Sequence, residues 1–168
     1  MIISNISLGE RVDVDPSSNI NYAKIGNGVK IAKRCSVFGG PDCQLEIGDE
    51  SYFGINTVVI GYWEKIIIGG NVSIAQNVNI MSASGPNASA KMQRVFPIMK
   101  GKVEIGNHCW IGANSIIMPD VVLGEYCVVA ANSFVNSSFP PYSVIGGNPA
   151  KLIRIFTNEE IAKLDEDC

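Results

Sequence analysis

The sequence holds one histidine, His108, and few charged residues for its length of 168. Charged side chains make up 17% of the chain, and acidic groups exceed basic ones to give a formal net charge of -3. No cluster of Lys and Arg lies among aromatic residues, so the sequence does not indicate a nucleic-acid-binding protein. A polyanionic partner is therefore not expected.

Long apolar runs and paired cysteines are also absent. No stretch approaches the roughly 18 apolar residues that cross a bilayer, and the opening residues lack the basic head and apolar core of a signal peptide. The 5 cysteines form no Cys-x-x-Cys pair and are odd in number, so neither a zinc site nor a disulfide framework is predicted. We expect a cytoplasmic protein with no membrane span, no bound metal and reduced cysteines.

The chain is rich in glycine and aliphatic residues, with 17 glycines and 46% hydrophobic residues. These residues fall into units of six that open with an aliphatic residue, often followed by Gly or Ala. The clear units are IGNGVK, IAKRCS, IGDESY, FGINTV, IGGNVS and IAQNVN, and then the unbroken series IGNHCW, IGANSI, IMPDVV, LGEYCV, VAANSF and VNSSFP.

This period of six has a geometric meaning. An inward aliphatic side chain stacks on its equivalent in the next coil, and Gly or Asn at the turns tolerates tight or left-handed backbone. Three strands and their corners close a triangular coil, and stacked coils bury a continuous aliphatic column. The period predicts an all-β solenoid over residues 1–155, with Cys35, Cys109 and Cys127 as small buried residues at the fifth hexad position.

Three segments depart from the period. Residues 61–65 predict a short corner loop, and residues 84–102 form a long polar excursion of the kind that tends to carry function on a rigid scaffold. Residues 156–168 predict a helical tail, because Thr157 or Asn158 can cap a helix with acidic residues in its first turn. We expect this tail to cover the last coil or an adjacent subunit.

The segment IGNHCWIGANSIIMPDVVLGEYCVVAANSFV, followed by PPYSVIGGNPAKLIR, resembles the closing section of the hexapeptide-repeat acyltransferases. These have a left-handed parallel β-helix fold and include maltose, galactoside and xenobiotic acetyltransferases and the O-acetyltransferases of capsule and exopolysaccharide synthesis. The resemblance covers roughly residues 20–155. It implies a homotrimer with active sites between neighbouring subunits, acetyl-CoA as acyl donor, and a sugar or nucleotide-sugar acceptor.

Matched position by position, the resemblance implies a set of contacts with acetyl-CoA. Trp110 would line the acyl end of the pocket, and the backbone of Ala113 would meet the pantetheine arm. The remaining matched positions are Ala131, Asn136, Lys151 and Arg154. The last two are basic, as the phosphates at the nucleotide end of CoA require.

The general base of such enzymes is missing at its usual position. Histidine suits this role because its pKa lies near neutrality, and in similar sugar acetyltransferases it follows the coil that reads like NVNI. Here Gly85 stands at or beside that position, and the nearby Ser82 and Ser84 are poor proton acceptors. His108 falls in a hexad turn, where a surface residue is expected and a displaced base is the alternative, so Ser82, Ser84 and His108 are weak catalytic candidates. A single histidine also excludes the zinc-dependent γ-class carbonic anhydrases, which share this fold.

The sequence says less about the acceptor. Asn56 falls near an Asn-containing stretch that lines the acceptor site of related enzymes, although a corner Asn with left-handed backbone explains it equally well. Asn87 and Gln93 are further candidates in the loop. Three hypotheses remain: acetyl transfer to a sugar amine, which needs less help from a base; O-acetyl transfer by a chain whose histidine was replaced; and a catalytically inactive β-helix with a binding or assembly role.

Overall fold

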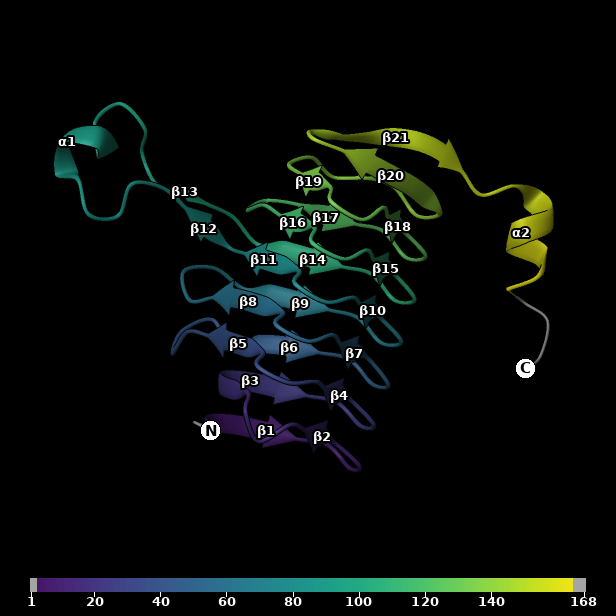
Figure 1. The fold of residues 1–168 in the computed structure, drawn as a ribbon, viewed down its shortest axis with the longest axis horizontal. Coiled ribbons are helices and arrows are strands. Elements are labelled where there is room, and N and C mark those ends of the chain that lie inside the picture. The colour runs from purple at the N-terminus through teal and green to yellow at the C-terminus, as the bar shows by residue number, and fades with distance from the viewer. Residues whose placement is uncertain (1–2, 165–168) are drawn as a thin grey trace.

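A computed structural model describes residues 3–164 of the chain. The chain winds into a left-handed parallel β-helix, as the hexads and the resemblance predict. Its coils stack from the N-terminal end at the bottom of Figure 1 to the C-terminal end at the top. Each regular coil passes through three short strands, one on each face of a triangular prism.

The first face is a sheet whose strands run parallel up to the last pair. From bottom to top, its strands are β2 (Asp13–Val14), β4 (Lys30–Ile31), β7 (Tyr52–Phe53), β10 (Ser73–Ile74), β15 (Trp110–Ile111), β18 (Val128–Val129), β20 (Ser143–Gly147) and β21 (Ala150–Ile155). The last pair, β20 and β21, is antiparallel, so the chain reverses at the top of the stack.

The other two faces meet at β3 (Asn19–Ile25), whose first half pairs with β5 and whose second half pairs with β6. Below it, β1 (Ile3–Leu8) pairs along the same strand. The second face continues upward through β5 (Ser36–Gly39), β8 (Val58–Gly61), β11 (Asn79–Met81), β16 (Ile116–Ile117) and β19 (Phe134–Val135). The third face continues through β6 (Leu45–Ile47), β9 (Ile66–Ile68), β14 (Val103–Ile105) and β17 (Val122–Leu123).

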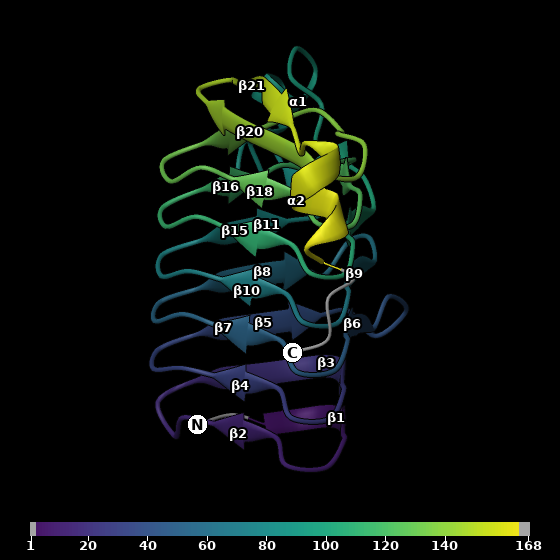
Figure 2. The ribbon, with the colours of Figure 1, turned by 90° about the vertical axis from the view of Figure 1, so that its right-hand side faces the viewer.

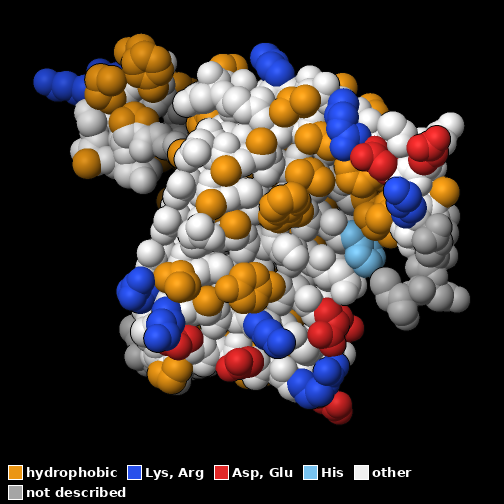
Figure 3. Space-filling model, turned by 45° about the vertical axis from the view of Figure 1, so that its right-hand side comes forward, with side chains coloured by type: hydrophobic (Ala, Val, Ile, Leu, Met, Phe, Trp, Pro, Cys, Tyr) orange, Lys and Arg blue, Asp and Glu red, His pale blue; other side chains and the backbone are white. Residues whose placement is uncertain are grey.

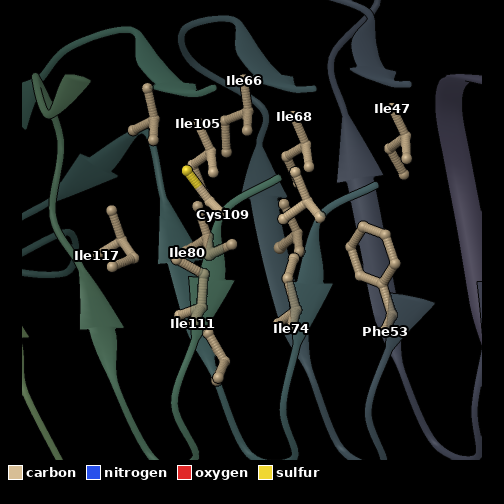
Figure 4. Packing of buried hydrophobic residues seen from close by; sticks show 14 of the residues in the cluster. Ile47, Phe53, Ile66, Ile68, Ile74, Ile80, Ile105, Cys109, Ile111 and Ile117 are labelled. Carbon is tan, nitrogen blue, oxygen red and sulfur yellow. The ribbon is translucent and has the colours of Figure 1, made fainter. Parts of the chain in front are cut away.

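The core is the column of aliphatic side chains that the period of six predicts. Figure 4 shows side chains from all three faces meeting in the interior, among them Phe53 and Ile74 from the first face and Ile105 from the third. These side chains are at most 2% exposed. Burying such columns in every coil removes their apolar surface from water and is the main force that holds the stack together.

The predicted role of three cysteines is confirmed, because Cys35, Cys109 and Cys127 are at most 1% exposed. Burial raises the pKa of the Cys35 thiol, as expected for an inert packing residue. Cys43 lies in a corner loop and donates to the backbone carbonyls of Gly61 and Tyr62. Cys168 lies outside the described residues.

The three corners of the prism differ in character. The straight corner joins the first face to the second and turns tightly in the coils that hold Arg34, Asn56, Asn77, Asn114 and Asn132. The looped corner joins the second face to the third and carries three extended loops, residues 40–44, 62–65 and 82–102. The third corner joins the third face to the first and holds a stack of aromatic rings.

Two short helices lie outside the prism: α1 (Ala90–Gln93) in the long loop and α2 (Asn158–Ala162) after β21. Thr157, one of the two caps that the sequence predicts, caps α2 in a reciprocal capping box with Glu160. Figure 2 shows α2 standing beside the upper coils. Residues 165–168 of the predicted tail lie outside the described range, and neither described helix has the length that a bilayer span requires.

Candidate functional site

A column of side-chain amides runs up the straight corner. Each Asn of the column has a positive φ near 60°, and each of the lower three donates to the side-chain oxygen of the Asn one coil above. The bonds are Asn56 to Asn77 at 3.0 Å, Asn77 to Asn114 at 3.1 Å and Asn114 to Asn132 at 3.2 Å, with Arg34 Nε donating to Asn56 at 2.8 Å from below. The column links the turns of this corner from one coil to the next.

Asn56 is therefore placed in this column with its amide nitrogen and oxygen both engaged. Its backbone is left-handed, with a φ of 61°, and Asn adopts this conformation at a lower conformational energy than most residues. The backbone therefore accounts for Asn at this corner. Binding of the acceptor by Asn56 stays a prediction.

The predicted cofactor residues Ala113 and Ala131 lie one above the other on the straight corner. Backbone bonds fix the order of the column: Asn132 N donates to Ala113 O, and Asn114 N donates to Gln76 O. Gln76 and Ile55 occupy the equivalent places in the two coils below. The corner thus changes from long side chains below to methyl groups above, which leaves the backbone of the upper coils open to a ligand.

Trp110 stands beside this upper corner, on the outer side of β15. Its side chain is 57% exposed, an unusual state for a large aromatic residue. Its neighbours on the same outward row are Ser73 below and Val128 above. Trp110 thus lies on the outward row of β15, and Ala113 and Ala131 lie at the corner that follows β15 and β18. Their contact with acetyl-CoA stays a prediction.

The basic residues predicted to meet phosphates lie on β21, at the top of the first face. Lys151 is exposed and lies opposite Gly146. The Arg154 guanidinium is engaged by the Glu160 carboxylate of α2, with bonds of 2.7 and 2.9 Å. This guanidinium, with the Thr157 amide, lowers the pKa of Glu160 to about 2. Asn136 is exposed just after β19, on a different part of the top coil.

The long loop leaves the looped corner through a two-stranded stalk, β12 (Ala83–Ser84) paired antiparallel with β13 (Met99–Lys100). Ser82, at its root, is fully buried: its hydroxyl accepts from Glu64 N and donates to Ile60 O. These bonds explain a serine at this position. Ser84 is half-buried in the stalk.

Gly85 stands where the stalk opens into the loop, and Ile98 of the returning chain closes against it. A Cβ atom at Gly85 would lie 2.9 Å from the Ile98 Cα and 3.1 Å from its Cγ1. Atoms that are not bonded do not approach so closely, so any side chain here requires the returning backbone to move. The position at or beside which similar enzymes have a histidine thus has room for glycine only.

The tip of the loop folds on itself and stands away from the prism (Figure 1). Ser89 caps α1, and the Gln93 side chain donates to the backbone carbonyls of Pro86 and Asn87. Asn87 is exposed beside this turn. The tip also exposes large apolar side chains, which are Met92, Val95 and Phe96, at 46%, 69% and 60%, and Met99 of the stalk is 52% exposed.

A cation–π contact joins the stalk to the corner loop beneath it. The Lys100 ammonium lies 4.1 Å from the centre of the Trp63 ring, and Tyr62 meets the same ring edge-to-face at 5.6 Å. This contact orients the root of the long loop. No sequence pattern predicts this contact, because 37 positions separate the two residues.

His108, the single histidine, lies at the third corner. Its ring stacks on Tyr126 at 4.7 Å and 6° between planes, and Tyr126 stacks on Tyr142 at 5.2 Å. Its φ of 58° marks the expected hexad turn. The histidine is thus part of a structural stack at a different corner from the long loop.

The structure therefore separates two groups of predicted site residues. Trp110, Ala113 and Ala131 lie at the straight corner, whereas the loop with Gly85 leaves from the looped corner across the second face. One copy of the chain does not bring them together. Among residues 3–164, no group of three His, Cys, Asp or Glu side chains is arranged to hold a metal ion.

Comparisons with known proteins agree with this architecture. Residues 102–137 match the family model described as bacterial transferase hexapeptide (six repeats). A dTDP-4-amino-4,6-dideoxy-D-glucose acyltransferase from Escherichia coli is 31% identical over 88% of this chain and 80% of its own length. The chain spans only 58% of the length of a chloramphenicol acetyltransferase from Klebsiella aerogenes, with 31% identity over 61% of this chain.

Among solved structures, the N-acyltransferase AntD from Bacillus cereus, in complex with dTDP and 3-hydroxybutyryl-CoA, superposes with a TM-score of 0.79. The two sequences are 26% identical, and the match covers 98% of this chain and 88% of AntD. The similarity thus extends over the whole solenoid.

Proposed function

Because the chain belongs to the bacterial hexapeptide-repeat transferase family, we propose that it transfers an acyl group from acyl-CoA to the amino group of a sugar. Two of the proteins described above support an amine acceptor. The Escherichia coli relative is named for an amino sugar, AntD is an N-acyltransferase, and both matches cover most of this chain. Acetyl-CoA is the donor we favour.

The single observation that best supports this acceptor is the packing of Gly85 against Ile98. A hydroxyl is a weak nucleophile and needs a base to remove its proton as attack begins. A neutral amine already has a free electron pair, which forms the new C–N bond as the C–S bond of the thioester breaks. The nitrogen then loses a proton to give the amide, and the released thiolate takes up a proton to give free CoA. Neither step requires a protein imidazole.

The upper straight corner has the properties that an acyl-CoA substrate requires. Ala113 and Ala131 leave the backbone accessible, and the exposed Trp110 ring can pack against the acyl end. Lys151 supplies a positive charge at the far end of this surface. Arg154 lies on the same strand, with its guanidinium paired to the Glu160 carboxylate.

We further propose that the site is completed between copies of the chain in a homotrimer. The apolar tip of the long loop, led by Val95 at 69% exposure, is suited to pack on a second copy. This arrangement would bring Gly85, Ser84 and Asn87 of one copy toward Trp110 of the next. A cytoplasmic location is proposed with it, since the four described cysteines are free thiols, which suits a reducing compartment.

The proposal is tested by mixing wild-type protein with acetyl-CoA and pairs of sugars that differ only by an amino group in place of a hydroxyl. Release of free CoA thiol measures turnover. We expect turnover with amino sugars at a rate at least about a hundredfold above the matched hydroxyl sugars, as expected when a base worth that factor is missing. Equal rates for both members of a pair would overturn amine transfer.

Calorimetry with CoA tests the cofactor surface separately. We expect wild-type protein to bind CoA, and Trp110→Ala and Lys151→Ala to bind it more weakly. Lys24→Ala is the matched control, because Lys24 is exposed on the third face. Absence of binding by the wild type would instead support an inactive β-helix.

A further inference from the structure

Side chains at one position of the straight corner change in length from coil to coil. The backbone bond from Asn114 N to Gln76 O places Gln76 one coil below Ala113. Ala131 lies one coil above Ala113, and Ile55 lies one coil below Gln76. Neighbouring coils are about 4.8 Å apart, so this row passes from two methyl groups to a long side chain within a single step.

The fold does not account for a glutamine at this place. Gln76 is exposed, and among residues 3–164 it has neither a left-handed backbone nor a hydrogen-bond partner for its side-chain amide. The neighbouring Asn77, by contrast, has a φ of 58° and two side-chain hydrogen bonds within the amide column. The length of the Gln76 side chain is therefore not set by packing or bonding within the described chain.

A hollow of about 340 Å³ lies directly beyond Gln76. It is lined by Tyr52, Gly54, Ile55, Asn56, Gln76 and Asn77, none of which is charged. Tyr52 and Ile55 give it apolar surface, because their side chains are 45% and 39% exposed. Figure 3 shows charged side chains of both signs gathered over the lower coils, below a region of hydrophobic and uncharged side chains. The hollow therefore suits an apolar group.

Gln76 stands between this hollow and the proposed acyl-CoA surface. With Lys151 at the nucleotide end, that surface descends past Ala131 to Ala113, and Trp110 lies in the same coil as Ala113. A short acyl group ends within this coil, whereas each further carbon carries the chain down toward Gln76. A long side chain there occupies the space that a longer acyl chain needs, and overlap of the two is costly.

From this arrangement we infer that Gln76 limits the length of the acyl chain that the protein accepts. It ends the acyl-CoA surface below Ala113 and keeps acyl groups longer than acetyl out of the hollow. The inference rests on the proposed acyl transfer and adds the residue that selects the donor. Gln76 acts by filling space, so its replacement by alanine extends the row of methyl groups by one coil and joins the acyl-CoA surface to the hollow.

Calorimetry with donors of increasing length tests this inference without an acceptor. The dissociation constants of CoA, acetyl-CoA, butyryl-CoA and hexanoyl-CoA are measured for wild type and for Gln76→Ala. Wild type is expected to bind acetyl-CoA at least as tightly as hexanoyl-CoA. In Gln76→Ala, the affinity for hexanoyl-CoA relative to acetyl-CoA should rise about ten- to hundredfold, because each methylene removed from water contributes about a factor of four.

Three further variants separate the length of the side chain from its amide and from the size of the hollow. Gln76→Met keeps a long side chain without the amide and should keep the wild-type order of affinities. Ile55→Ala enlarges the hollow but leaves Gln76 in place, so it should keep that order as well. Ile55→Ser added to Gln76→Ala should reduce the gain for hexanoyl-CoA, because the hollow then loses apolar surface. Affinity for CoA itself should be the same in all variants, since CoA ends above Gln76.

The outcomes for this inference and for the function on which it rests are distinct. An unchanged ratio of hexanoyl-CoA to acetyl-CoA affinity in Gln76→Ala, or an equal gain in Gln76→Met, would overturn the role of Gln76. So would a wild type that already binds hexanoyl-CoA more tightly than acetyl-CoA. In each of these cases CoA is still bound and the proposed function stands. A wild type that binds none of the four ligands would overturn the proposed function instead.

Discussion

The straight corner and the looped corner flank the same face and are built from the same six-residue units, yet they differ in what they tolerate. At the straight corner, amides bond from Asn56 to Asn132 through successive coils. At the looped corner, the chain turns tightly at Asp120 but extends by 21 residues between β11 and β14. A solenoid therefore accepts insertions where its turns are independent, and resists them where side chains link one turn to the next.

Insertion of two glycines at each corner should produce the largest contrast. Placed between Gln76 and Asn77, they move Asn77 out of the amide column and shift β11 out of register, and we expect a loss of roughly 3 kcal/mol or more in the free energy of unfolding. Placed between Phe96 and Pro97, they should change it by less than about 0.5 kcal/mol, since loop length costs little. Urea denaturation measures both, and similar losses at the two sites would contradict the distinction.

Substitution of Gly85 tests a tight contact at the base of the long loop. Gly85→Ala should destabilise the stalk by roughly 1–3 kcal/mol, because the new Cβ meets the Ile98 backbone. Hydrogen exchange of the β12 and β13 amides reports the loss, and Ser84→Ala is the matched control with little change. Gly85→His meets the same atom, so we expect no gain in O-acetyl transfer from it. Unchanged amide exchange rates in Gly85→Ala would show that the Ile98 backbone moves to accommodate the new Cβ.

Removal of one amide from the column measures the link between coils. Asn77→Ala loses two side-chain hydrogen bonds and places alanine at a φ of 58°, so we expect a cost of about 1–2 kcal/mol by thermal or urea unfolding. Asn77→Gly separates the two causes, since glycine accepts this backbone and lacks only the amide. Asn87→Ala, in the loop, should cost under about 0.5 kcal/mol. If Asn77→Ala and Asn87→Ala lower the free energy of unfolding equally, the amide column does not stabilise the fold.

The smallest effect is expected at the contact between Trp63 and Lys100. Trp63→Ala should cost about 0.5–1 kcal/mol, the range for an exposed cation–π pair, and should speed proteolysis within the long loop. Trp63→Phe retains a ring face and should recover most of the protection. If the loop is cleaved at the wild-type rate in Trp63→Ala, the stalk is oriented by its backbone bonds alone.

The sequence predicts the regular part of this molecule well because its information is local. A period of six identifies the inward residues, the turns at His108 and Asn114, and the buried cysteines. The loop boundaries at residues 84 and 102 are close to the observed stalk. A cap at Thr157 or Asn158 is also predicted, and the structure has Thr157, whose partner Glu160 is only three positions away.

What the sequence does not predict depends on contacts between distant positions or on chain direction. Ile98 closes on Gly85 only because the stalk pairs antiparallel, and no periodic signal specifies that pairing. The pairing of Arg154 with Glu160 requires α2 to fold back beside β21. The division of the predicted site between two corners follows from the path of each coil around the prism. Motif matching alone does not give that path.

The reversal of the chain at β21 bears on a hazard that every open solenoid has. A parallel stack that ended in a free parallel edge would be a template for the first coil of another molecule, and fibres could grow by repeated addition. Here the last strand runs antiparallel to β20, so a coil that arrives in parallel register meets a strand of the wrong direction. Exposed Lys151 and Arg154 add charge to that strand. The reversal removes the free parallel edge of the first face at this end of the rod, which disfavours end-to-end growth through that face.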